Sequence, residues 1–89
     1  MENVNTRELE QQIFDKEEIR VVIRAQKDTT FKGYPYSKKA AVNTSITDWA
    51  ATRLKPLVGE HEVEVIDGSG RSPHGLTHIE KVRRSYIEK

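Results

Sequence analysis

The stretch Glu18-Ile19-Arg20-Val21-Val22-Ile23-Arg24-Ala25 decides how this sequence folds. Apolar, mostly β-branched residues occupy every second position, and arginines stand between them. Such a period of two is typical of a strand with one buried face and one solvent-exposed face. We therefore predict a strand over residues 18–26.

A second strand is predicted over residues 61–67, where valines again alternate with charged residues. If the two strands pair, Arg20 and Arg24 lie across from Glu62 and Glu64, and these opposite charges help to fix the register. The long connection over residues 27–60 predicts a right-handed crossover, which would make the pair parallel.

A helix is predicted between the strands, over residues 45–56. Ser45 can cap the first turn, and Asp48 follows three residues later, as in a capping box. Pro56 is expected to end the helix near Lys55. One helical face is apolar and consists of Ile46, Trp49, Ala50, Leu54 and Leu57. At this spacing Trp49 is expected in the core rather than in a ligand site.

Both ends of the chain are expected to contain helical segments. Thr77 and Glu80 form a second capping-box pattern, and Ile79, Val82 and Tyr86 follow at helical spacing, so a helix is predicted over residues 77–88. Residues 1–15 are interpreted as an acidic N-terminal arm, partly helical or disordered, with a short helix. Residues 16–89 then form a single domain.

These elements predict an α+β fold, a small two-layer α/β sandwich whose core is strand 18–26, helix 45–56, strand 61–67 and helix 77–88. The order strand, aromatic segment, helix, strand and a turn with His74-Gly75-Leu76-Thr77 also resembles a β-grasp arrangement. That alternative implies a further strand within residues 29–42.

Composition excludes several classes of protein. The chain has 89 residues, a net charge of +1 and no cysteine, which excludes disulfides and zinc–thiolate sites. No stretch approaches the roughly 18 apolar residues of a membrane span, and the N-terminus carries no basic and apolar leader. We expect a cytoplasmic protein without a membrane partner.

The glycine-rich loop after the second strand comes closest to a chemical motif. Gly70 and Gly75, followed by Leu76-Thr77, have the spacing of a phosphate-binding P-loop, but Leu76 replaces the essential lysine. Nucleotide hydrolysis is therefore not expected. Backbone N–H groups of such a loop, together with Arg71 and Thr77, could still bind an anion. The alternative is a turn whose glycines serve chain reversal.

Metal and catalytic motifs are weak. His74 and His78 are four residues apart, but no acidic residue offers an obvious third ligand. Asp67, at the end of a strand, is better suited to bonding backbone N–H groups of its own turn. The serines lack an evident base. We predict no metal site, no cofactor and no enzymatic activity.

Nucleic-acid binding is the function that the sequence favours, because cations and aromatic rings occur together. Their loop contains Lys32, Tyr34, Tyr36, Lys38 and Lys39, and the glycine-rich loop and C-terminal helix would extend the surface with Arg71, Arg83 and Arg84. The alternative is a protein-interaction module or small accessory or inhibitor protein that acts by dimerisation or by docking at a sheet edge. Salt should weaken phosphate binding but not edge docking.

Overall fold

The structure of the protein is a computed structural model that describes residues 3–26 and 28–87. Its described residues form two two-stranded antiparallel sheets and three helical regions, which confirms the predicted α+β class. In chain order the elements are β1 (Asn3–Asn5), α1 (Thr6–Glu17), β2 (Arg20–Arg24), β3 (Thr30–Lys32), the continuous helix α2 (Ile46–Trp49), η1 (Ala50–Leu54) and α3 (Lys55–Val58), then β4 (Glu62–Ile66) and α4 (Ile79–Ser85).

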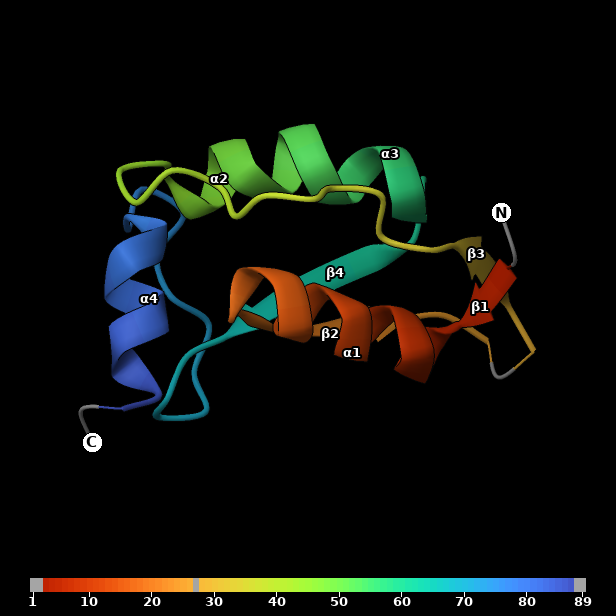
Figure 1. The fold of residues 1–89 in the computed structure, drawn as a ribbon. Helices are drawn as coiled ribbons and strands as arrows, with labels where there is room; N and C mark the ends of the chain where they lie inside the picture. The colour runs from red at the N-terminus through yellow and green to blue at the C-terminus, as the bar shows by residue number, and fades with distance from the viewer. Residues whose placement is uncertain (1–2, 27, 88–89) are drawn as a thin grey trace.

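The central sheet pairs β2 with β4, the two strands predicted from the alternating pattern. Val21 lies opposite Val65, and Ile23 lies opposite Val63. The pair is antiparallel, so the predicted parallel crossover is wrong. Between the strands the chain crosses the molecule twice, once through residues 33–44 and once back through α2–α3 (Figure 1). It therefore enters β4 at the end where it left β2.

The residues predicted as an acidic arm are part of the fold where the structure describes them. Asn5 caps α1 through a reciprocal capping box with Glu8. The helix then buries Leu9 and Ile13 completely. At its C-terminus Glu18 takes a left-handed conformation with φ 59° and turns the chain into β2. The N-terminal helix is thus longer than predicted and contributes to the core.

The middle helix continues past Pro56, where the sequence predicted its end. Ser45 caps it as expected, by accepting the N–H of Asp48 at 3.1 Å. Proline cannot donate a backbone hydrogen bond, so the carbonyl of Thr52 loses its helical partner. The helix accommodates Pro56 with the π-helical turn η1, and the hydroxyl of Tyr36 donates to the Thr52 carbonyl at 3.3 Å.

The start of α4 differs from the prediction. The N-cap is His78, not Thr77, and the described helix spans only Ile79–Ser85. Residue 88 of the predicted helix lies outside the described residues. The β-grasp alternative is wrong, because within residues 29–42 only β3 is a strand and it pairs with β1 rather than with the central sheet.

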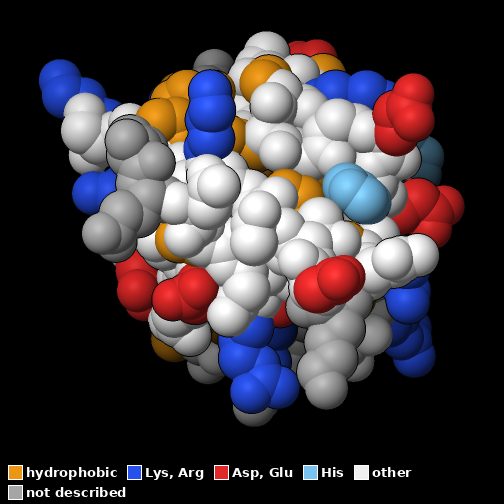
Figure 2. Space-filling view, turned by 90° about the vertical axis from the view of Figure 1, so that its right-hand side faces the viewer, with side chains coloured by type: hydrophobic (Ala, Val, Ile, Leu, Met, Phe, Trp, Pro, Cys, Tyr) orange, Lys and Arg blue, Asp and Glu red, His pale blue; other side chains and the backbone are white. Residues whose placement is uncertain are grey.

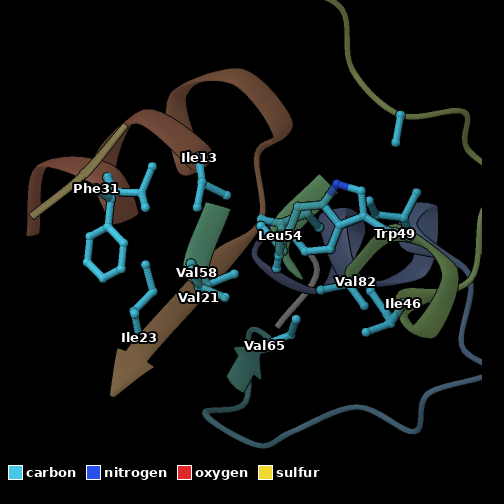
Figure 3. Close-up of a cluster of buried hydrophobic side chains, with 14 residues drawn as sticks. Ile13, Val21, Ile23, Phe31, Ile46, Trp49, Leu54, Val58, Val65 and Val82 are labelled. Atoms are coloured by element: carbon cyan, nitrogen blue, oxygen red, sulfur yellow. The ribbon is translucent and has the colours of Figure 1, made fainter. Parts of the chain in front are cut away.

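One apolar cluster joins the central sheet to all the helices. Trp49 is fully buried, as predicted, and lies near Ile46, Leu54 and Val82 in the close-up of Figure 3. Phe31 of β3 closes the other end of the cluster. The hydrophobic interior therefore runs the length of the molecule, and candidate binding residues must be sought at its surface.

Candidate functional site

Two of the predicted binding residues, Tyr34 and Arg83, point inward to the carboxylate of Glu17. This side chain is fully buried at the end of α1. The hydroxyl of Tyr34 donates to Glu17 Oε2 at 2.5 Å, and Arg83 donates to Glu17 Oε1 at 3.0 Å. Arg53 donates to Oε2 at 2.6 Å, and the N–H of Ala40 donates to Oε1 at 2.8 Å. We call these five residues the Glu17 cluster.

The Glu17 cluster connects segments that are distant in the sequence through hydrogen bonds to one buried charge. Burial alone would raise the pKa of Glu17, but hydrogen bonds from Tyr34, Ala40 and Arg53 outweigh burial and hold this pKa below its usual value. Burial and the adjacent carboxylate raise the pKa of Tyr34. The carboxylate thus stays ionised between two guanidinium groups, and these groups serve the fold rather than an external ligand.

The rest of the predicted basic and aromatic loop is dispersed. The ring of Tyr36 packs against Tyr34 and lies 4.6 Å from the guanidinium of Arg53. Lys39 forms an ion pair with Glu18. Lys32 lies on β3, at the opposite end of the molecule from α4 (Figure 1). Basic and acidic side chains are mixed at the end of the molecule that carries β1 and β3, as Figure 2 shows. Lys38 is exposed.

The backbone N–H groups of the glycine-rich loop donate hydrogen bonds to other groups of the protein. Asp67 Oδ1 accepts the N–H groups of Ser69 at 2.8 Å and Arg71 at 3.0 Å, as expected of a turn-forming aspartate. Gly70, with φ 81°, donates to the Asp67 carbonyl. Gly68 donates to Ser85 Oγ at 2.8 Å. Backbone N–H groups over residues 68–71 are therefore occupied within the protein, and any anion here must be bound by side chains.

Gly75 and Thr77 join the starts of two helices. Ile46 donates its N–H to the Thr77 carbonyl at 2.9 Å, and Ile79 donates to the Thr44 carbonyl at 2.8 Å. The Gly75 carbonyl accepts the N–H of Thr47 at 2.9 Å. Thr77 thus connects the helix starts through its backbone and does not cap α4 by its side chain.

Four hollows that share lining residues cross the surface from α1 and β2, past this loop, to α4. The first, of about 350 Å³, contains Arg7, Phe14 and Arg20. Arg20 also lines the second, of about 350 Å³, together with Tyr86 and the loop over residues 67–70. Asp67 also lines the third, of about 250 Å³, with His74, Thr77, Lys81 and Ser85. Thr77 and Lys81 continue into the fourth, with Arg84. We call these four hollows the Arg20 groove.

Several cations of the Arg20 groove have no carboxylate partner among the described residues. Arg7, Arg20 and Lys81 form no ion pair with any described residue. Two of the groove's carboxylates are instead bound to backbone donors: Glu10 accepts the N–H of Ile23 at 2.8 Å, and Asp67 is held by its turn. Both carboxylates keep their negative charge, but neither forms an ion pair with Arg7, Arg20 or Lys81, so these three side chains can still contact an anionic ligand.

Sequence reasoning missed the residues that matter most in this arrangement. Leu9, Ile13 and Glu17 follow one another at intervals of four, so the carboxylate had to share the buried face of the helix. Phe14 and Arg20 were assigned to a helix and a strand but to no site. The described chain contains no group of three His, Asp or Glu side chains that could hold a metal ion.

No protein-family model matches this chain, and no curated protein or solved structure matches it significantly. Within the described residues, none of the helices has the length and apolar character needed to cross a membrane.

Proposed function

We propose that this chain is a non-enzymatic binding domain that contacts the phosphate backbone of a nucleic acid along the Arg20 groove. The observation that carries the proposal is the set of cations Arg7, Arg20 and Lys81, which have no acidic partner among the described residues and line hollows that share residues with one another. A row of hollows suits a polymer with regularly spaced charges better than one compact ligand. Phosphate contacts supply most of the affinity in such complexes.

Further groups in the groove suit phosphate oxygens. His74 accepts the N–H of Leu76 at its Nδ1, so the proton of the neutral ring is on Nε2, a donor. Thr77 adds a hydroxyl to the same hollow. Arg71, in the adjacent loop, extends the positive charge, and Arg84 lines the fourth hollow, where it forms an ion pair with Glu80 at 3.6 Å. From the sequence prediction we retain Gly70, Arg71, Gly75, Thr77 and Arg84 as part of or beside this surface.

A role without catalysis is supported by the hydrogen bonds of Ser85, one of the hydroxyl side chains that line the groove. Ser85 Oγ donates to the Val82 carbonyl at 2.5 Å and accepts the N–H of Gly68. Its proton and lone pair therefore support the loop and helix. A cytoplasmic location belongs to the same proposal and agrees with a chain that needs no disulfide.

The test is the salt dependence of binding to a labelled single-stranded oligonucleotide, measured by fluorescence anisotropy. For single strands each phosphate contact contributes about 0.7 to the slope of log affinity against log salt. Arg20→Ala with Lys81→Ala should therefore lower this slope by about 1.4 and weaken binding at low salt.

The matched control removes the same number of charges elsewhere. Lys32→Ala with Lys55→Ala changes two exposed lysines of β3 and α3, outside the groove. This control should leave the slope unchanged. Equal losses in the two double variants would mean that only net charge matters, and wild-type protein that binds no oligonucleotide at low salt would refute the proposal.

A second candidate, docking of a partner protein's strand on β4, is favoured by the orientation of Val63. Ile23 donates its N–H to Glu10, away from β4, so Ile23 and Val63 form a non-hydrogen-bonded antiparallel pair. The backbone groups of Val63 then point away from β2, and no described residue bonds to them. Strand addition would be insensitive to salt, and the same salt series therefore distinguishes the two candidates.

A further inference from the structure

Phe14 is an aromatic side chain at the surface of the Arg20 groove. It follows the buried Ile13 on α1, yet 36% of it is exposed. The guanidinium of Arg20 lies 5.9 Å from the centre of its ring, and the ring of Tyr86 meets it in a T-shaped contact with centroids 6.2 Å apart. Two neighbours thus hold the ring without burying it.

The support behind this ring is firm. The hydroxyl of Tyr86 accepts the N–H of Arg20 at 2.9 Å and donates to the carbonyl of Ile66. It therefore bridges β2 and β4 at the position where their ladder ends. This bridge holds the side chain of Tyr86 against the sheet, and the ring of Tyr86 in turn supports Phe14 through their T-shaped contact.

The two tyrosines that the sequence suggested for stacking are engaged elsewhere. Tyr34 donates to the buried Glu17, and Tyr36 packs against Tyr34 and Arg53. Phe14 lines a hollow together with Arg7 and Arg20, which are cations suited to the phosphates on either side of a base. An aromatic face beside two cations that pair with no acid within residues 3–26 and 28–87 has the composition of a single-strand binding platform.

We infer that Phe14 and Arg20 stack an unpaired nucleobase, so that the groove takes single-stranded nucleic acid in preference to duplex. The inference rests on the proposed phosphate recognition and adds its base-binding element. A paired base cannot offer its face to Phe14, because its neighbours in the duplex already cover that face. An unpaired base can enter the hollow while its phosphates remain with Arg7 and Arg20.

The test compares Phe14→Leu with Phe14→Tyr on three probes: a short oligothymidine, the same strand with abasic residues, and a duplex of equal length. Stacking of a base on an aromatic ring is worth about 1–3 kcal/mol, which corresponds to a loss of about 5-fold or more in affinity for Phe14→Leu. Phe14→Tyr keeps the ring and should bind within about twofold of the wild type. Val42→Ala is the control, since Val42 is 55% exposed and lines none of the four hollows.

The abasic strand separates stacking from phosphate binding. Wild-type protein should bind it more weakly than oligothymidine, and Phe14→Leu should bind both strands equally. Thermal unfolding of each variant checks that the fold is intact. If the wild type and Phe14→Leu bind oligothymidine equally while Lys81→Ala still weakens binding, base stacking is refuted and the proposed phosphate binding stands. Absence of salt-sensitive binding to every probe would overturn the proposed function with it.

Discussion

Glu17 and Arg83 stand 66 residues apart in the chain, and their side chains meet at 3.0 Å where α1 ends against α4. Arg83 also donates through Nε to the backbone carbonyl of Glu17 at 2.7 Å. One arginine therefore binds both the carboxylate and the main chain of a buried residue. This contact, with that of Arg53, links the N-terminal helix to the two helices that follow it.

Replacing Glu17 by alanine should destabilise the protein severely. The change leaves two guanidinium groups beside a buried site without their counter-charge, which costs about 3–5 kcal/mol. Urea unfolding measures the loss. Tyr34→Phe removes only one hydrogen bond to the carboxylate and should cost less, about 1.5–3 kcal/mol. Glu18→Gln, at the exposed neighbouring position, is the control, and an equal loss there would contradict the role given to Glu17.

Acid should weaken the fold through the same carboxylate. The pKa of Glu17 in the folded state lies below its unperturbed value of 4.5. Its contribution to stability is therefore complete above about pH 4.5 and is lost as the pH falls through the folded pKa. The free energy of unfolding should decrease over this acidic range. Glu17→Gln should show a shallower decrease, and an identical pH profile in both proteins would rule out this linkage.

The pair formed by Arg24 and Glu64 should show energetic coupling across the central sheet. Their side chains form an ion pair at 3.0 Å, and Ser72 Oγ donates to the same carboxylate at 2.6 Å. Glu64→Lys should lower stability, and adding Arg24→Glu should restore part of the loss. Both groups are exposed, so the effect is small and decreases with salt. Strictly additive effects in the double-mutant cycle would exclude coupling.

Gly68 is required by the close approach of the loop to α4. A Cβ atom at this position would overlap the backbone carbonyl of Ser85, which cannot move away as a flexible side chain could. Gly68→Ala should cost about 1–3 kcal/mol and displace the loop from the helix. Gly33→Ala is the matched control, because its Cβ would meet only the side chain of Gln12, at 3.2 Å. Similar melting temperatures for both variants would contradict this account.

The elements that the sequence predicted well are those with a strong local pattern. Alternating β-branched residues identified β2 and β4, and the cap at Ser45 with the apolar face around Trp49 identified the start of the middle helix. Nine apolar residues of the predicted strands and helices are buried, namely Ile19, Val21, Ile23, Ile46, Trp49, Leu54, Val65, Ile79 and Val82. Local periodicity predicts which residues are buried, because the spacing of apolar residues shows which of them share one face of a strand or helix.

The features that the sequence could not provide depend on contacts between distant segments. The antiparallel pairing follows from the path through β3 and residues 33–44, which have little regular periodicity. Continuation of the helix beyond Pro56 depends on η1, together with the Tyr36 hydroxyl. Tyr34 and Arg83 were assigned to the binding surface because cations and aromatic rings occur together in the sequence, and only the buried Glu17 explains their inward orientation.

The most direct test of the central proposal is a titration of isotopically labelled protein with a short single-stranded oligonucleotide, followed by backbone amide shifts at low and moderate salt. Binding along the Arg20 groove should shift the amides of Phe14, Arg20, Gly70 and Lys81, with shifts that diminish as salt rises, and should leave Lys32 unaffected. Shifts confined to β1 and β3, or no shifts at low salt, would contradict the proposal.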